Sequence, residues 1–439
     1  MQISQGMSYS NRFISSLSEI KAEDWDDLLQ NSIGSTGANP FLRHAFLHSL
    51  HESGAACKKT GWQPHYLTVW QILDAADTTG NPVANTGPLP LPPRHSELPH
   101  NRPAVISLPP QEPRHPAARL VAAMPLYLKT HSYGEYVFDW AWADAYQRHG
   151  LNYYPKLLSA IPFTPVCGPR LLARDGAAQA TLLAALCEAR VASSTSSCHI
   201  LFPPEEQAQL LAEHGFLLRQ GVQFHWQNQG YQDFEHFLAS LEQKKRKNIR
   251  AERRKVQDAG VRFRLVRGKD SALADWQFFQ RCYDATYAAH FSSPYLNLDF
   301  FLRIATQMPE NILLVIAEQH DQPIAASLLI HDRHTLYGRY WGSLKTVPCL
   351  HFETAYYQAL EFCIREQIQC FEGGAQGEHK MARGFLPQTT WSAHWLGHPA
   401  FADAVELFLQ RERGSISLYV DELNDRNPFR PHASRPDGT

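Results

Sequence analysis

The sequence predicts an α+β protein in which helices flank mixed β-sheets. Three observations favour this class. Strand-like runs occur in pairs joined by turns, stretches with helical spacing alternate with them, and the second half of the chain repeats the plan of the first. Hairpins placed between helices indicate layers around a mixed sheet. With 439 residues, the chain has room for two domains with sizeable cores.

The first half is expected to contain four helices and four strands. Gly215 follows one of these helices at the position where a left-handed residue commonly ends a helix. The predicted elements, in chain order, are helices at 21–30 and 40–54, strands at 66–73 and 120–128, a helix at 176–192, a strand at 198–202, a helix at 204–214 and a strand at 222–226.

A proline-rich segment separates the strands at 66–73 and 120–128. Residues 79–116 hold 11 of the 29 prolines and few large apolar side chains. Such a segment buries too little surface to offset its ordering entropy. We therefore predict a disordered insertion in the loop of a β-hairpin, with a docking segment for a partner as the alternative.

The second half is expected to follow the same plan. The run at 336–343 is rich in aromatic residues, as strands are, and 351–366 carries an apolar stripe at helical spacing. The predicted elements are helices near 232–258 and 270–290, a helix from near Leu298, strands at 312–318 and 324–331 joined by Asp321-Gln322-Pro323, a strand at 336–343, a helix at 351–366 and a strand at 368–373.

A basic run lies inside the predicted helix at 232–258. Eight of the twelve residues at 244–255 are basic and one is acidic, in a chain of net charge −2. Like charges at this density repel unless an anion compensates them, so the run indicates a surface for tRNA or another phosphate-rich ligand. A solvated face with internal salt bridges is the alternative. The residues predicted to bind the polyanion are Lys244, Lys245, Arg246, Arg250 and Arg253.

The loop after the last predicted strand combines glycines with acid, base and cation. Residues 371–385 read Phe-Glu-Gly-Gly-Ala-Gln-Gly-Glu-His-Lys-Met-Ala-Arg-Gly-Phe. Glycines let a backbone take positive φ or approach a ligand closely, and loops at strand ends are where such folds place chemistry. The segment is therefore the leading candidate for an active-site loop.

The order of strand, loop, helix and strand at 336–373 resembles the FemAB/FemX aminoacyltransferases, which are built on the acyl-CoA N-acyltransferase (GNAT) fold. Glu372-Gly373-Gly374 and Arg383-Gly384-Phe385 stand where that family has an acidic residue with two glycines and then a basic, aromatic run. The segments 135–140, 162–165 and 244–255 also match local patterns of the bacterial FemAB-like N-acyltransferases.

The resemblance covers roughly residues 12–420 apart from the insert, and it implies two GNAT-like domains, each a mixed sheet flanked by helices. The first would span 12–228 and carry the insert at 79–116. The second would span 229–420 and carry the basic helix and the active-site loop, and 421–439 would be a flexible tail. The implied activity is transfer of an acyl or aminoacyl group, from a CoA thioester or an aminoacyl-tRNA, to an amine on a small molecule or a cell-wall precursor.

Acyl transfer to an amine needs a deprotonated amine, a polarised carbonyl and an acid for the leaving group. The candidate bases are Glu372 or His379, with His290 and Glu353 as alternatives. The residues predicted to bind the cofactor are Ser343, His351, Gly373, Gly374, Lys380 and Arg383. No GxSxG or Cys–His motif indicates an acyl-enzyme. Residues 343–351 also lack the GxG turn that holds the CoA pyrophosphate in GNAT enzymes, so backbone amides at the start of the helix would hold phosphate instead.

The predicted substrate-binding residues come from both halves. Those of the second half are Tyr337, Arg339, Trp341 and Tyr356, and those of the first half are Asp139, Trp142 and Tyr146. Aromatic side chains interleaved with Asp and Lys suit a cleft for an amine or a sugar-like substrate. The first-half set suits a core between domains equally well.

The remaining features are those of a cytoplasmic enzyme. Eight cysteines without a CxxC pair indicate reduced thiols, and the polar start of the chain lacks a signal core. No apolar run is long enough to span a bilayer. His331 and His334 have no evident third ligand, so no metal is expected. The alternative to an enzyme is a non-catalytic module of the same fold that binds RNA or phosphate.

Overall fold

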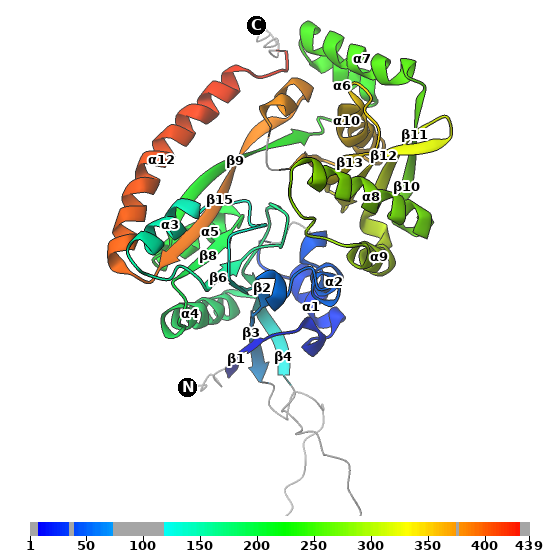
Figure 1. Ribbon diagram of the computed structural model, residues 1–439. Coiled ribbons are helices and arrows are strands. Elements are labelled where there is room, and N and C mark those ends of the chain that lie inside the picture. The colour runs from blue at the N-terminus through cyan, green and yellow to red at the C-terminus, as the bar shows by residue number, and fades with distance from the viewer. Residues whose placement is uncertain (1–7, 35–38, 73–117, 375–376, 431–439) are drawn as a thin grey trace, which may run out of the picture.

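The computed structural model describes residues 8–34, 39–72, 118–374 and 377–430 (Figure 1). It confirms the predicted α+β class, because helices pack around one large mixed sheet and one small antiparallel sheet. In these four ranges no helix is both long and apolar enough to cross a membrane. The predicted disordered insert at 79–116 lies outside the described residues.

The large sheet has eleven strands in the order β10-β11-β12-β13-β14-β9-β15-β8-β6-β5-β2, and the small sheet has the order β1-β3-β4-β7. The strands up to residue 227 are β1 (Tyr9–Ile14), β2 (Trp62–Pro64), β3 (Tyr66–Ile72), β4 (Ala118–Met124), β5 (Tyr127–Lys129), β6 (Lys156–Ser159), β7 (Leu172–Ala173), β8 (Ser197–Leu201) and β9 (Leu217–Gln227). The later strands are β10 (Val261–Arg267), β11 (Ile312–Gln319), β12 (Gln322–His331), β13 (Thr335–Ser343), β14 (Cys370–Glu372) and β15 (Leu386–Leu396).

The helices cover both sheets. Those of the first half are α1 (Ala22–Gln30), α2 (His44–Glu52), α3 (Trp140–Arg148), α4 (Gly176–Ala192) and α5 (Glu205–Glu213). Those of the second half are α6 (Phe234–Ser240), α7 (Gln243–Asp258), α8 (Leu273–Ala289), α9 (Leu298–Gln307), α10 (Leu350–Phe352), α11 (Gln358–Glu366) and α12 (Pro399–Asp425). A π-helical turn at Glu353–Tyr357 joins α10 to α11, so 350–366 forms one helical run.

Two long strands join the halves of the molecule. β9 and β15 run antiparallel through the middle of the large sheet (Figure 1), and β15 also pairs with β8 of the first half. Strand β15 therefore lies late in the sequence but completes the first-half part of the sheet. The division into domains at 12–228 and 229–420 stays a prediction, and in the strand order β14 of the second half pairs directly with β9 of the first half.

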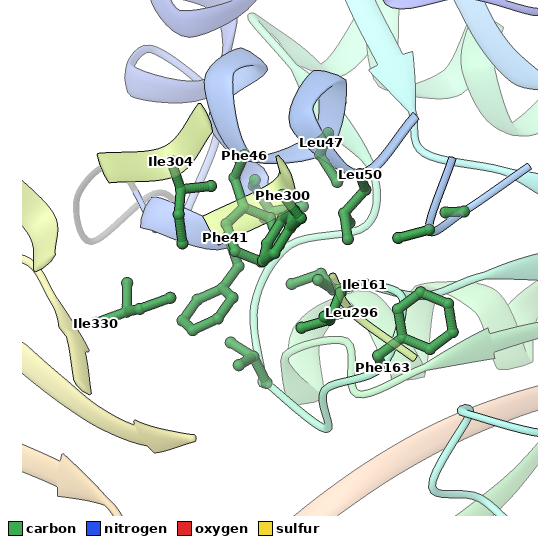
Figure 2. Close-up of a cluster of buried hydrophobic side chains, with 14 of the residues drawn as sticks. Phe41, Phe46, Leu47, Leu50, Ile161, Phe163, Leu296, Phe300, Ile304 and Ile330 are labelled. Carbon is green, nitrogen blue, oxygen red and sulfur yellow. The ribbon is translucent and has the colours of Figure 1, made fainter. Parts of the chain in front are cut away.

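A buried aromatic and aliphatic core also spans both halves. Phe46 of α2 meets Phe300 of α9 edge to face at 5.5 Å, and Phe41 meets Tyr337 of β13 at 5.0 Å. Figure 2 shows Phe41, Phe46 and Phe300 grouped with Ile304 and Leu296. Each of the side chains in this group is at most 2% exposed. Since this core fixes first-half helices against β13, it sets the position of the strand that carries the candidate site.

Several predicted elements are confirmed with shifted ends. β3 and β4 pair as an antiparallel hairpin around the insert, as the strands at 66–73 and 120–128 predicted. β11 and β12 form the second predicted hairpin, and its turn places His320 and Asp321 in the left-handed region. The run at 120–128 is divided into β4 and β5 at Pro125, which has no N–H to donate to a ladder.

The single helix predicted at 232–258 is wrong. α6 ends at Ser240 and α7 begins at Gln243, because Leu241 is extended and fully buried, where it forms a β-bridge with Phe429. The helix predicted at 40–54 likewise begins as a 3₁₀ turn, and α2 starts only at His44.

The flexible tail was predicted to begin too early. Helix α12 continues to Asp425, and Leu423 is fully buried in the core beneath α6 and α11. Residues 421–425 therefore continue α12, Leu423 and Pro428 are buried, and in this tail only 431–439 lie outside the described residues. Strand β15 and helix α12 were not predicted from the sequence at all.

The shared core makes a specific prediction about stability. We expect Phe46→Ala to lower the free energy of unfolding by about 3–5 kcal/mol, the range for deleting a buried aromatic side chain. We also expect the chain to unfold in one transition, measured by urea denaturation with circular dichroism and tryptophan fluorescence. The exposed Leu407→Ala on α12 is the control, with an expected change within about 0.5 kcal/mol. Two separate transitions in the wild-type protein would show that the halves do not share a core.

Candidate active site

The candidate site lies where β13 and β14 separate. The two strands are parallel and pair over three residues, ending at Tyr337 opposite Glu372. Beyond this point β13 continues to Ser343, whereas β14 ends and the chain turns away. Beyond Tyr337, the edge of β13 that faced β14 has no neighbouring strand among the described residues. This leaves an opening between the two strands, and side chains of both strands meet there.

Two irregularities of β13 shape this opening. Arg339 is the extra residue of a β-bulge, since Gly338 pairs with Leu329 and Tyr340 with Leu328. Bulges re-aim side chains next to active sites, and here Arg339, Tyr340 and Trp341 all line one cavity. Gly342 lets helix α8 lie directly on the strand, because a Cβ at this position would lie 1.9 Å from the carbonyl oxygen of Cys282.

A buried ion pair spans the point of separation. Arg339 Nη2 donates to Glu372 Oε2 at 3.1 Å, and the two side chains are 2% and 8% exposed. Burial raises the pKa of Glu372 to about 7, although Arg339 acts in the opposite direction. Within the described parts of the chain, the Nε–H of Arg339 is buried without an acceptor. The site therefore offers a carboxyl group that titrates near neutral pH and an unused donor beside it.

Each member of this pair lines a separate cavity. The Glu372 cavity has a volume of 580 Å³, and its lining includes Tyr337, Asn39, Cys167 and Gln207. The Arg339 cavity has a volume of 320 Å³ and lies between β13 and α8, with Tyr136, Tyr283, Tyr287, His290, Trp341 and His351 in its lining. Each member of the pair therefore lines a cavity of its own that could hold a molecule.

A third cavity adjoins the Arg339 cavity. The helix-start cavity, of 350 Å³, is lined by residues 343–347 and 349–352 and shares Trp341 and His351 with its neighbour. His351 contacts the ring of Trp341 at 5.0 Å and that of Tyr356 at 5.4 Å. Burial, together with the nearby His379, Arg383 and Lys380, lowers the pKa of His351 to about 4. The same positive surroundings favour an anion at this place.

The glycine-rich loop supplies a buried lysine. Lys380 is 2% exposed, and its Nζ donates to the carbonyl oxygen of Gly374 at 2.9 Å. Burial, with a smaller effect from Arg339, lowers the pKa of Lys380 to about 7. Its stem also packs on Gly373. His379 of the same loop is exposed and lies near the rings of Phe352 and Tyr356. Partial desolvation by these neighbours, with the nearby Arg383 and Lys380, lowers its pKa from the usual value.

The structure gives Arg383 and Glu353 a different role from the one predicted. Arg383 donates to Glu252 at 2.8 Å, to the hydroxyl of Tyr357 at 3.0 Å and to the carbonyl of His379 at 2.7 Å. Glu353 accepts from Arg253 at 3.0 Å and from Gln358 at 2.8 Å. Both side chains are occupied in fastening α7 to the helical run at 350–366, so we no longer assign them to a ligand or to proton transfer.

The first-half residues predicted to bind substrate lie apart from this opening. Trp142 and Tyr146 belong to a small hydrophobic cluster between α3, β15 and α12, and Asp139 is ion-paired with the fully buried Lys156. They therefore form the core that the sequence left as the alternative to a cleft. Their charged neighbours form a separate network, which is described below.

The basic helix α7 divides into paired and unpaired cations. Arg253 pairs with Glu353 and Glu361, and Arg250 pairs with Glu235. Across the described ranges the other six cations of the run make no ion pair, and they are Lys244, Lys245, Arg246, Lys247, Arg254 and Lys255. Four of these six, Lys244, Lys247, Arg254 and Lys255, are exposed on the side of α7 opposite the buried Ile249 and Val256, whereas Lys245 and Arg246 are half-buried. These four form the outer basic face, which remains suited to a polyanion.

Sequence reasoning found the second-half residues of the site but missed those of the first half. Tyr136 was noted only as part of a family pattern, yet it lines the Arg339 cavity with a left-handed backbone (φ 63°). Asn39, Cys167 and Gln207 of the Glu372 cavity come from two distant loops and from helix α5, and no spacing in the sequence connects them. Among the described residues, no three His, Cys, Asp or Glu side chains gather as metal ligands.

Comparison with known families decides the family of this chain. The family model described as FemAB-like, for peptidoglycan biosynthesis and recognition, matches residues 16–80 and 111–431. The chain belongs to the FemAB-like family. This result confirms the resemblance drawn from 135–140, 162–165 and 371–385. No curated protein sequence matches the chain.

Solved structures with a related arrangement have low sequence identity. FemX is 11% identical to this chain in sequence, with a TM-score of 0.49, and the match covers 87% of this chain and 98% of the FemX chain. A tandem GNAT protein from the clavulanic acid biosynthesis pathway is 10% identical with a TM-score of 0.43, covering 89% and 99%. The protein L-PGS from Bacillus licheniformis is 11% identical with a TM-score of 0.42, covering 66% and 86%.

The raised pKa of Glu372 predicts a pH-dependent contribution to stability. Because its pKa rises from 4.5 to about 7 on folding, this contribution is complete below about pH 4.5 and is lost as the pH rises through about 7. Glu372→Gln lacks this titration. We therefore expect the unfolding free energy of the wild type, relative to the variant, to fall between these two pH values and then level off. The measurement is urea denaturation of both proteins across that range. A difference that does not change with pH would contradict the raised pKa.

Proposed function

We propose that this protein is an N-acyltransferase that moves an acyl or aminoacyl group from a CoA thioester or an aminoacyl-tRNA to an amine acceptor. The observation that carries the proposal is the Arg339–Glu372 pair at the separation of β13 and β14, in which Glu372 lines one cavity and Arg339 lines another. Membership of a family described by peptidoglycan biosynthesis and recognition supports a cell-wall precursor as the acceptor.

The two members of the pair suit different parts of the reaction. Glu372, with a pKa of about 7, is ionised in part of the molecules at neutral pH and takes the proton of the attacking amine, directly or through a water. The unused Nε–H of Arg339 donates to the carbonyl oxygen as it gains negative charge. The C–N bond forms, the C–S or C–O bond of the donor breaks, and the leaving thiolate or ribose oxygen takes up a proton.

The donor side is the chain of cavities from Arg339 to the start of the helical run at 350–366. Arg383 and the partly protonated Lys380 lie near His351 there and supply positive charge, and backbone amides at the helix start can bind phosphate. The amine acceptor then enters from the Glu372 cavity, where Asp332 and Glu206 favour a cationic group before it is deprotonated. Both donor classes are cytoplasmic, so we propose that the reaction takes place in the cytoplasm.

The outer basic face of α7 favours aminoacyl-tRNA over a CoA thioester as the donor. Lys244, Lys245 and Arg246 keep the polyanion role proposed for them, since no carboxylate in the described ranges neutralises them. Arg250 is ion-paired with Glu235, and Arg253 is ion-paired with Glu353 and Glu361, so these two arginines are less available to a polyanion. The alternative function, a non-catalytic module for RNA or phosphate, rests on this face alone and gives no role to the buried Glu372.

The test of the catalytic proposal compares two isosteric changes. Glu372→Gln is expected to lower kcat by roughly 10²-fold or more, the lower limit usual for removing a general base. Glu353→Gln is the matched control, because its carboxylate faces Arg253 and lines neither cavity, and its turnover should stay near that of the wild type. The measurement is transfer from acetyl-CoA, longer acyl-CoAs or aminoacyl-tRNA to an amine. Full activity in both Glu372→Gln and His379→Ala, with the fold intact, would remove this assignment.

The proposed tRNA surface makes a separate prediction. Changing Lys244, Lys247 and Lys255 together to Ala should weaken binding of bulk aminoacyl-tRNA. It should also reduce the slope of log affinity against log salt by about 0.7–0.9 for each phosphate that the variant no longer binds. The control changes three exposed lysines elsewhere, Lys21, Lys58 and Lys59. The measurement is fluorescence anisotropy over a salt series. Equal slopes in the two triple variants would show that α7 does not bind the tRNA.

A further inference from the structure

Strands β8 and β15 carry the same short pattern side by side. Each has a serine followed two residues later by a histidine, Ser197 and His199 on β8 and Ser392 and His394 on β15. Residues two apart on a strand share a face, and the antiparallel register places His394 opposite His199. The four side chains therefore lie together on one face of the large sheet.

These side chains belong to a continuous hydrogen-bonded chain. Ser392 Oγ lies 2.8 Å from His394 Nε2, and His394 Nδ1 lies 2.8 Å from His199 Nδ1. His199 Nε2 lies 3.0 Å from the hydroxyl of Tyr153, which donates to Asp139 Oδ2 at 2.6 Å. We call these five residues the serine relay. Each of them is at most 4% exposed.

The chemistry of the partners indicates one arrangement of protons along the serine relay. Burial alone would raise the pKa of Asp139, but the ammonium of Lys156 lowers it below its usual value, so Asp139 is ionised and can only accept. Tyr153 has one hydrogen and gives it to Asp139. The oxygen of Tyr153 must then accept from His199 Nε2–H.

The same reasoning continues to Ser392. Burial lowers the pKa of His199 to about 3 and that of His394 well below its usual value, so each ring carries one N–H. Since His199 uses its N–H at Nε2, its Nδ1 accepts from His394 Nδ1–H. His394 Nε2 must therefore accept, and the hydroxyl of Ser392 must donate to it. Ser197 Oγ, 2.8 Å from His199 Nε2, can accept from the same N–H.

Ser392 ends the serine relay at a cavity. This Ser392 cavity has a volume of 210 Å³ and lies between β9, β15 and α12, with Tyr136, Phe138, Gly221 and Thr390 in its lining. Trp142 packs on the ring of His394 at 5.0 Å and shields the inner part of the relay. A serine whose proton is held by a neutral histidine, itself oriented by a further group, has the arrangement of an activated nucleophile.

We propose that Ser392 is a nucleophilic serine that accepts an acyl group from an activated ester or thioester bound in the Ser392 cavity. A bond forms between Ser392 Oγ and the acyl carbon, and the C–O or C–S bond of the donor breaks. The hydroxyl proton passes to His394 Nε2 and then to the leaving oxygen or sulfur. Attack by water or an amine on the acyl-serine, with His394 as the base, restores the hydroxyl. This site is separate from Glu372 and does not rest on the function proposed for it.

The test uses p-nitrophenyl acetate as the probe and intact-protein mass spectrometry as the readout. Peptide mapping of the wild-type protein should place one acetyl group on Ser392, and Ser392→Ala should remove it. Thr389→Ala, an exposed hydroxyl on the same strand, is the control and should be acetylated as the wild type is. His394→Asn removes the base and should slow acetylation by roughly 10²-fold.

Further measurements distinguish activation of Ser392 from a structural role of the relay. Tyr153→Phe keeps the ring but removes the hydroxyl that orients His199, so it should slow acetylation while leaving the circular dichroism spectrum unchanged. This variant keeps the proposal open to test even where His394→Asn does not fold. Acetylation confined to lysines, or an unchanged acetylation rate in Ser392→Ala or Tyr153→Phe, would overturn the proposal.

Discussion

The short pairing of β13 with β14 is the constraint on which the rest of the site depends. The strands share three residue pairs and then separate, and the Arg339–Glu372 ion pair spans the point of separation. The bulge at Arg339 and the packing of α8 on Gly342 hold β13 on one side. The Phe41–Tyr337 contact holds it from the first half. Because both halves contribute to this position, the site depends on the whole chain.

Charged residues of the second half serve two different purposes. Arg383 with Glu252, and Arg253 with Glu353, fasten α7 to the helical run at 350–366, and their side chains are occupied by one another. The cations of the outer basic face take no part in these pairs and remain unpaired within the described ranges. Some cations of this single basic run therefore hold α7 to the rest of the protein, and others are exposed at the surface. Only the surface part is suited to an external polyanion.

Local patterns allowed the sequence to predict local features. The hairpins β3–β4 and β11–β12, the helical run at 350–366 and the family resemblance all follow from residues close together in the chain. Features that join distant residues could not be predicted in this way. The pairing of β15 with β8 links residues about two hundred positions apart, and the serine relay exists only in that register. The sequence also predicts a helix at Leu241, because the contact that holds this residue extended is with Phe429, which is far away in the chain.

The most direct test of the central claim is a crystal structure of the protein with a donor analogue that cannot transfer its acyl group, such as a CoA thioether or a stable amide of aminoacyl-tRNA. The account predicts that the acyl group lies in the Arg339 cavity, with its carbonyl oxygen facing Arg339 Nε and its carbon accessible from Glu372. An acyl group found at another place, with the Arg339 cavity empty, would contradict the assignment of the separation of β13 and β14 as the site of acyl transfer.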